Sequence, residues 1–506
     1  MIHSAPLVLP VSAPFVRDAA LVVRHGRVAA LGPRREILAA WPGEAETRWE
    51  GMLVAGLVNA HTHLQYTHMA EVGRRPHASF EEWSTAFDEV YHALSSTSST
   101  SADPPAASPV PEPGASGAAC AGPAGWAAAA RDGARWLLRS GTTSAADVVT
   151  DLAAAHALRE AGLGGLPYLE TLGDTDADWA ASGRERFTAL LDAAGPPLGV
   201  SPHAPYTLDT GTLRDVTRLA RSRGMRLHVH LAEGRHEREY TVSGTGPLAR
   251  MVRELGFDFA ILREGGTGLG PAAFLDALGM LGPDCHVAHG VHLDAADRAL
   301  LRERGTAVAL CPRSNRTLGE EGPDVAALLT EGNPIAVGTD SLASSPSLDL
   351  LHDVAALRDL AVRQGYRAGD LDRRLVEAAT LGGARALGIT GGLSAGGPAD
   401  FAVFDVAAGR EPYRALVEEG AGRCVATIVG GATLWDAARS GSAGHGAAGH
   451  GPAVHGAAGH GPAGHGSAVH GSAVHGSAGS GAVGSGAVGS GAADAGVTGF
   501  QTAGAG

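Results

Sequence analysis

Two histidines separated by one residue, His61 and His63, follow an apolar run that begins at residue 52. Residues two apart on a strand point to the same side, so the two imidazoles should face one region of space. Neutral imidazole is a common ligand for zinc and related metals. A His-x-His pair is weak evidence by itself, but it makes a metal site the first hypothesis for this chain.

Further ionisable side chains stand where later apolar runs end. A single residue of this kind is best explained as a satisfied polar group in a loop. Six such residues at five predicted strand ends favour a shared site instead. The six are His61, His63, His203, His230, His289 and Asp340, and Glu233 lies three residues after His230.

Eight short apolar runs must position these groups, and Ala-, Leu- and Arg-rich segments with helical spacing lie between several of them. Repeated strand–helix alternation is typical of a (β/α)8 barrel, whose chemistry lies at the carboxyl ends of its strands. The runs are 52–60, 142–149, 163–170, 197–204, 225–233, 285–293, 306–312 and 333–341.

Short β-rich runs also occur near both ends of the chain, at 19–32, 399–406 and 424–435. They predict one small sheet domain built from both termini, and two unrelated β segments are the alternative. We therefore expect an α/β protein, a (β/α)8 barrel with a small β-sandwich domain. The predicted parts are 1–50 and 391–439 for the sandwich, 51–390 for the barrel, 95–125 as a flexible insertion and 440–506 as a disordered tail.

The tail repeats glycine, alanine, histidine and serine, and histidine recurs every fifth residue from His445 to His475. So much glycine cannot bury a core. Loose metal binding and a codon repeat without function both remain open for these histidines. The first possibility keeps a non-catalytic metal-binding or storage protein as a rival to an enzyme.

Composition excludes several classes of function. The net charge of -14 disfavours a nucleic-acid partner, because phosphate binding needs a basic surface. All 39 basic residues are arginine, which excludes a Schiff-base lysine and a carboxylated lysine bridging two metals.

The N-terminus lacks the pattern of a signal peptide, and no window approaches a membrane span. With four scattered cysteines, these features predict a cytoplasmic protein without a membrane partner.

Several motifs together resemble the amidohydrolase superfamily, in the branch of adenosine-type nucleoside, cytosine and guanine deaminases and triazine hydrolases. The resemblance covers about residues 15–435, and the motifs occur together and in order. They are NAHTHL (59–64), SPHAPYT (201–207), HLAE (230–233), AHGVHL (288–293), CPRSN (311–315) and GTDS (338–341).

The resemblance implies a role for each strand-end residue. One divalent metal, zinc or alternatively iron, is held by His61, His63, His230 and Asp340. Glu233 and His289 handle protons and orient the attacking water, together with Asp340 as the acceptor of the water proton. His203 corresponds to a histidine on the substrate side.

Other residues are weaker candidates. Gln65 follows the metal pair and Trp83 lies in a predicted lid helix, so both are candidate substrate contacts. Ser314 and Asn315 follow a strand, where turn formation is the alternative to substrate binding. His228 shares a face with His230 one layer deeper, so it is either a core residue or a support for the metal site.

The function implied is hydrolysis of a carbon–nitrogen bond in a cyclic amidine, releasing ammonia from a 6-aminopurine nucleoside. The candidate substrate is aminodeoxyfutalosine, of menaquinone biosynthesis. S-adenosylhomocysteine, methylthioadenosine, guanine, cytosine and triazines are the alternatives within the same branch. The expected partner is this small molecule, and a homo-oligomer is left open.

Overall fold

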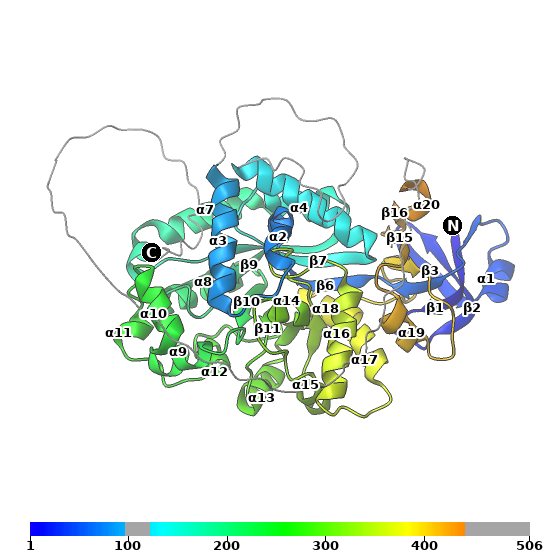
Figure 1. The fold of residues 1–506 in the computed structure, drawn as a ribbon. Coiled ribbons are helices and arrows are strands. Elements are labelled where there is room, and N and C mark those ends of the chain that lie inside the picture. Colours follow the sequence, from blue (N-terminus) through cyan, green and yellow to red (C-terminus); the bar gives the residue numbers. More distant parts are fainter. Residues whose placement is uncertain (97–121, 441–506) are drawn as a thin grey trace, which may run out of the picture.

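The computed structural model describes residues 1–96 and 122–440. Most of the predicted insertion (95–125) and of the predicted tail (440–506) therefore lies outside the described residues. The strands form two sheets, a barrel and a smaller sheet beside it that joins the blue and orange ends of the chain (Figure 1). This arrangement confirms the predicted α/β class, with a barrel and a β domain built from both termini.

The barrel contains eight strands that pair in parallel, in the order in which they occur along the chain. Each of the eight predicted runs overlaps one of them, so the (β/α)8 prediction is confirmed. The strands are β6 (Leu57–Thr62), β7 (Thr142–Val149), β8 (Gly164–Thr171), β9 (Gly199–Pro202), β10 (Leu227–Leu231), β11 (Cys285–His289), β12 (Ala307–Leu310) and β13 (Ile335–Val337).

The seam between β13 and β6 closes at the end of the barrel that carries the histidines. The backbone N–H groups of Thr339 and Asp340 both donate to the carbonyl oxygen of His61, at 3.1 and 3.0 Å. Behind the seam, a Cβ atom at Gly382 would collide with the Ile335 carbonyl oxygen. Glycine there lets a helical turn lie directly against the barrel wall.

Helices follow every barrel strand and cover the outside of the barrel (Figure 1). Several begin at an aspartate whose side chain accepts a hydrogen bond from a backbone N–H of the first turn, a favoured N-cap arrangement. The principal helices are α4 (Gly122–Arg139), α5 (Ala157–Glu160), α7 (Arg184–Ala194), α8 (Thr210–Ser222), α10 (Gly246–Glu254), α12 (Pro271–Ala277), α13 (Ala295–Arg304), α15 (Val325–Glu331), α16 (Leu350–Arg363), α17 (Leu371–Glu377) and α18 (Gly383–Leu387).

The second sheet is mixed, and its strands come from both ends of the chain. The apolar run 52–60, which predicts one strand, is divided between the two sheets at Gly56. None of the helices in the two described ranges is long and apolar enough to cross a bilayer. The strands of the second sheet are β1 (Ile2–Leu9), β2 (Val16–Arg24), β3 (Arg27–Pro33), β4 (Glu46–Arg48), β5 (Met52–Ala55), β14 (Phe401–Phe404), β15 (Cys424–Val429) and β16 (Ala432–Asp436).

Candidate active site

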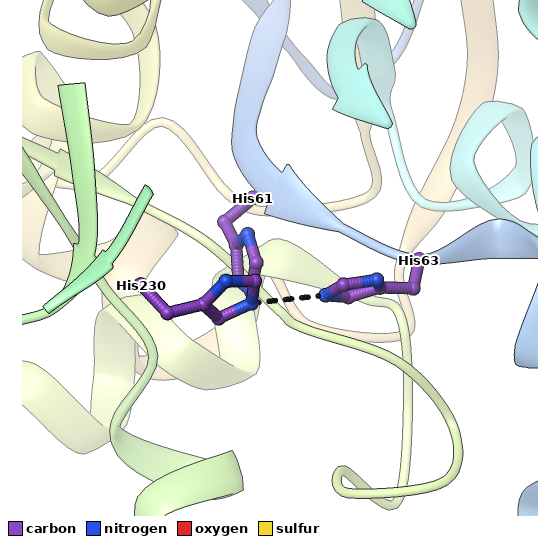
Figure 2. A group of neighbouring side chains, drawn as sticks. All are labelled: His61, His63 and His230. Carbon is purple, nitrogen blue, oxygen red and sulfur yellow. Dashed lines mark hydrogen bonds between the residues drawn. The ribbon is translucent and has the colours of Figure 1, made fainter. Parts of the chain in front are cut away.

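Three imidazoles and one carboxylate meet at the carboxyl end of the barrel. His61 lies near the end of β6 and His63 directly after it, His230 lies on β10, and Asp340 follows β13. All four side chains are buried. Figure 2 shows the three imidazoles pointing toward one another, with His230 coming from a strand opposite the one that carries the other two.

The four groups are close enough to share one cation. His63 Nε2 lies 3.3 Å from His230 Nε2, and Asp340 Oδ1 lies 3.5 Å from His61 Nε2 and 3.7 Å from His63 Nε2. Zinc with ligand bonds of about 2.1 Å holds neighbouring ligand atoms about 3.4 Å apart in tetrahedral geometry. The observed separations match one such coordination sphere.

The nitrogen lone pairs of this cluster also fit a metal. His230 Nδ1 is 2.9 Å from the His203 carbonyl oxygen, to which it donates, and this leaves the Nε2 lone pair of His230 free. His61 Nε2 is buried and has no hydrogen-bond partner among the described residues. Burial and the neighbouring imidazoles lower the pKa of His63 well below its usual value, and burial lowers that of His230 to about 3. Neutral imidazoles of this kind are metal ligands.

The Asp340 carboxylate is held in place from three directions. Its Oδ2 accepts hydrogen bonds from Ser314 Oγ (2.7 Å) and Ser344 Oγ (2.8 Å), and its Oδ1 accepts one from the Ser341 N–H (2.7 Å). Burial alone would raise the pKa of Asp340, but the His61 imidazole, 3.5 Å from the carboxylate, and those of His63 and His289 hold it well below its usual range. Asp340 is therefore ionised and supplies the single negative charge of the ligand set.

Two of the strand-end residues adopt an unusual backbone conformation. Asp340 has φ 60° and His289 has φ 73°, in the left-handed region that favours glycine. The hydrogen bond from the Asp340 N–H to His61 helps to hold the first of these turns. Strained backbone that the surrounding structure enforces is concentrated at functional sites in proteins.

Glu233 and His289 form a second pair beside these candidate metal ligands. His289 Nε2 lies 3.4 Å from Glu233 Oε1, and Asn315 Nδ2 lies 3.1 Å from His289 Nδ1. Because the amide donates to Nδ1, the proton of the neutral imidazole is on Nε2, facing the site. Burial, followed by the charges of Asp340 and Glu237, raises the pKa of Glu233 well above its usual value. This shift favours the protonated carboxyl group, the form of Glu233 that can donate a proton.

One buried histidine supports the cluster from behind. His228 Nε2 lies 3.0 Å from His61 Nδ1, on the side of the ring that faces away from the other ligands. A partner at Nδ1 orients the imidazole and keeps its Nε2 lone pair directed at the metal position. Of the two hypotheses for His228, the structure favours support of the site over a purely apolar core role.

A cavity opens from this cluster of histidines and Asp340 toward helix α3 (Phe80–Ser96). The indole N–H of Trp83 on this helix donates to the Ala343 carbonyl oxygen at 2.9 Å, which fastens the helix to the loop after β13. His203 lines the same cavity, with its ring 4.5 Å from that of His230. The cavity is lined on this side by aromatic residues and elsewhere by polar ones, including Tyr66, Phe80, Phe87, Tyr91, Thr150, Glu170, Tyr206, Glu233 and Ser344.

Three of the residues predicted to contact substrate do not line this cavity. Ser314 and Asn315 lie on α14 (Pro312–Thr317) and hydrogen-bond Asp340 and His289, respectively. Gln65 is buried and exchanges two hydrogen bonds with Thr150. The structure places all three where they hold site residues in position.

Glu170 is the main cavity residue that sequence reasoning missed. It lies on β8, with Oε1 4.0 Å from His230 Nδ1 and 3.3 Å from the Ser201 hydroxyl that donates to it. Burial raises its pKa to about 8. The signal was available, because Glu170 ends the apolar run 163–170 in the same way as Asp340 ends its own run.

Comparison with known proteins gives consistent matches over the barrel. The model of the Amidohydrolase family matches residues 52–434. An aminodeoxyfutalosine deaminase of Deinococcus radiodurans is 32% identical over 73% of this chain and 81% of its own length. A 5-methylthioadenosine/S-adenosylhomocysteine deaminase of Nitratidesulfovibrio vulgaris is 29% identical over 78% of this chain and 80% of its own length.

Solved structures share the fold. The crystal structure of an adenosine deaminase from Xanthomonas campestris with bound zinc superposes with a TM-score of 0.67, at 24% identity. The match covers 86% of this chain and 92% of that one. At this level of identity the likeness supports the architecture of the barrel and its accompanying sheet.

Proposed function

Because this chain belongs to the amidohydrolase family, we propose that it is a metal-dependent deaminase that removes the 6-amino group of a purine nucleoside as ammonia. The observation that carries the proposal is the convergence of His61, His63, His230 and Asp340 within reach of one cation, beside the buried carboxyl group of Glu233. The names of the relatives supply the reaction and the substrate class.

The metal would be held by the three imidazoles and the Asp340 carboxylate, and zinc suits this set of nitrogen and oxygen donors. When bound, such a cation lowers the pKa of water from 15.7 to about 7 and supplies hydroxide near neutral pH. Iron, which imidazole also suits, is the alternative.

The chain's own residues then move the protons. Glu233 donates its carboxyl proton to a ring nitrogen of the purine, which makes the adjacent carbon electrophilic. Asp340 accepts the proton of the attacking water, and His289 orients that water through its Nε2–H. Asp340 passes this proton to the amino group, which leaves as ammonia when its bond to the ring carbon breaks. The hydroxyl group left on that carbon returns its proton to Glu233 and becomes the carbonyl group of the product.

The substrate is to be sought among 6-aminopurine nucleosides. Aminodeoxyfutalosine, 5-methylthioadenosine and S-adenosylhomocysteine all fit the proposed chemistry, because each presents the same aminated ring to the metal. Aminodeoxyfutalosine would place the protein in menaquinone biosynthesis, as expected from the sequence.

The direct test is a deamination assay of the purified full chain, with zinc content measured on the same sample. We expect ammonia release from at least one 6-aminopurine nucleoside, and loss of that activity on chelation with recovery on adding zinc. No release from any nucleoside of the panel, in a sample that retains metal, would contradict the proposal.

A further inference from the structure

Apart from histidines and tyrosines, the ionisable side chains on the cavity wall are all carboxyl groups. Besides Glu233 and Asp340 beside the metal position, the wall carries the carboxyl groups of Asp88 and Glu170. No arginine lines the cavity in the part of the chain that the structure describes, and the whole chain contains no lysine. Residues 97–121 and 441–506, which lie outside that part, contain no arginine either. Apart from the metal itself, the described part of the cavity therefore offers no permanent cation to an anionic substituent.

The wall away from the metal ligands is apolar and aromatic. Helix α3 contributes Phe80, Trp83 and Phe87, and Leu172 and Met251 lie on the same wall. Aromatic rings and aliphatic side chains favour an uncharged substituent, because an ionised group loses its hydration there without gaining a partner. Carboxylate oxygens such as those of Glu170 suit the hydroxyl groups of a ribose, which donate hydrogen bonds to them.

Arg235 is the nearest candidate cation, and it lines a neighbouring hollow that shares Phe80, Tyr206 and Met251 with the cavity. Its guanidinium already lies 3.2 Å from Glu320 Oε2 and donates to the Gly319 carbonyl oxygen at 3.1 Å. The Glu320 carboxylate thus neutralises Arg235, and the same hollow holds further carboxylates. A substrate carboxylate would have to compete with an existing ion pair.

Building on the proposed function, we infer that this cavity selects 6-aminopurine nucleosides whose 5′ substituent is uncharged, such as a methylthio group. It discriminates against substituents with a net negative charge, such as the carboxylate-bearing one of aminodeoxyfutalosine. The physical reason is desolvation: a carboxylate against this apolar and aromatic wall loses its hydration, and no arginine of the described residues lines the cavity to pair with it. Among the candidate substrates, methylthioadenosine fits this wall best.

A matched pair of substrates isolates the charge. Aminodeoxyfutalosine and its methyl ester share the purine, the ribose and the phenyl ring, and differ in one negative charge. We expect kcat/KM of the full-length zinc enzyme to be about tenfold higher for the ester, as expected when about 1.4 kcal/mol separates the two transition states. Methylthioadenosine should be turned over at least as well as the ester.

A variant of the protein that gains a cation tests whether the lack of one disfavours the substrate carboxylate. Met251→Arg places a cation on the cavity wall and should raise kcat/KM for the acid relative to the ester by about tenfold. Val362→Arg is the matched control, because Val362 is 43% exposed on α16 and lies outside the cavity lining. This control should leave the ratio at its wild-type value.

The outcomes separate the two proposals. If no nucleoside is deaminated, the proposed function fails. If the acid and the ester are deaminated equally well by the wild-type enzyme, the proposed function stands and the inference about charge is overturned. A drop in kcat/KM for the acid alone in Arg235→Ala would also overturn it, because Arg235 would then serve the carboxylate.

Discussion

At the scale of single residues, two histidines of β10 illustrate how one strand builds a site in layers. His230 directs Nε2 at the metal position, and His228, two residues earlier, lies 3.0 Å from Nδ1 of His61. Both residues point to the same side of the strand, as alternation requires. The inner histidine therefore orients a ligand that comes from a different strand.

This arrangement makes His228 a positioning residue with a measurable effect on the metal. His228→Phe should leave the His61 Nδ1–H without an acceptor and weaken zinc affinity by about 10- to 100-fold, as loss of such supporting contacts does. Affinity is measured by competition with a chelator, which reports on the site independently of activity. His228→Gln keeps an acceptor and should recover part of the affinity.

His286→Phe is the matched control for His228, because His286 is a buried histidine of the neighbouring strand that lies 3.0 Å from the Ala60 carbonyl oxygen. Equal loss of zinc affinity in the two phenylalanine variants would show that general packing, and not the bond to His61, is responsible.

Glu233 gives a second prediction at this scale. Glu233→Gln keeps the shape of the side chain but removes the proton that the carboxyl group donates, so kcat should fall by about 100- to 10,000-fold. Bound zinc should stay at the wild-type level, because Glu233 is outside the ligand set. Glu254→Gln, at the exposed end of α10, is the control and should retain activity. Unchanged kcat in Glu233→Gln would mean that another group supplies the proton.

At the scale of elements, a buried carboxyl group joins two neighbouring barrel strands. Asp147 on β7 accepts a hydrogen bond from the Leu64 N–H at 2.9 Å, just after β6 and the metal-ligand pair. Its other oxygen has no hydrogen-bond partner among the described residues. Burial raises the pKa of Asp147 from 3.8 to about 8, against the weaker effect of the Leu64 hydrogen bond.

The raised pKa of Asp147 determines whether the protein becomes more or less stable as pH rises. Between pH 4 and 8 the folded protein keeps the Asp147 proton while the unfolded chain has lost it, so this contribution to the free energy of unfolding falls as pH rises. Above about pH 8 both states are ionised and the decline stops. Asp147→Asn removes this dependence, so the stability of the wild type relative to the variant should decrease from pH 5 to pH 8.

Urea unfolding of both proteins at matched zinc saturation measures this difference. Asp258→Asn is the control, because the Asp258 side chain is 76% exposed and its removal should give no comparable trend. A difference between wild type and Asp147→Asn that stays constant across this pH range would show that Asp147 is already ionised in the folded state at pH 5.

Most of the barrel strands and the position of the site could be predicted from the sequence. The eight apolar runs predict eight strands, and His61, His230, His289 and Asp340 stand at the ends of four of them. Because a parallel barrel gathers the carboxyl ends of its strands on one side, these residues are predicted to lie together. The same rule applied to the run 163–170 would also have found Glu170. What followed from periodicity was therefore the framework and the position of the site.

The rest depended on contacts between elements far apart in sequence. Ser314 and Asn315 were expected to contact substrate or form a turn, but a short helix after β12 turns them toward Asp340 and His289. Which face of so short a helix points inward is decided by tertiary packing, and sequence spacing carries no signal for it. The division of the run 52–60 between two sheets is a tertiary effect of the same kind.

At the scale of the whole molecule, histidines occur in two very different settings. Those of the barrel are buried and converge on one point, held by hydrogen bonds from separate strands. Those from His445 to His475 recur at fixed intervals in a glycine-rich sequence. An enzyme and a metal-storage protein therefore make different predictions about how many metal ions the chain binds and where.

Deletion of residues 441–506 separates these hypotheses while keeping α20 (Ala437–Ser440) and both sheets complete. If the barrel site is the functional one, the full chain and the shortened chain should each retain about one zinc ion after dialysis, since one set of four ligands saturates one tetrahedral ion. Ammonia release per zinc ion should also be equal in the two proteins. A storage protein would instead bind several ions per chain and lose most of them with the repeat. Metal analysis after dialysis, run beside the deamination assay, measures both quantities, and loss of tightly held zinc on deletion would contradict the barrel site.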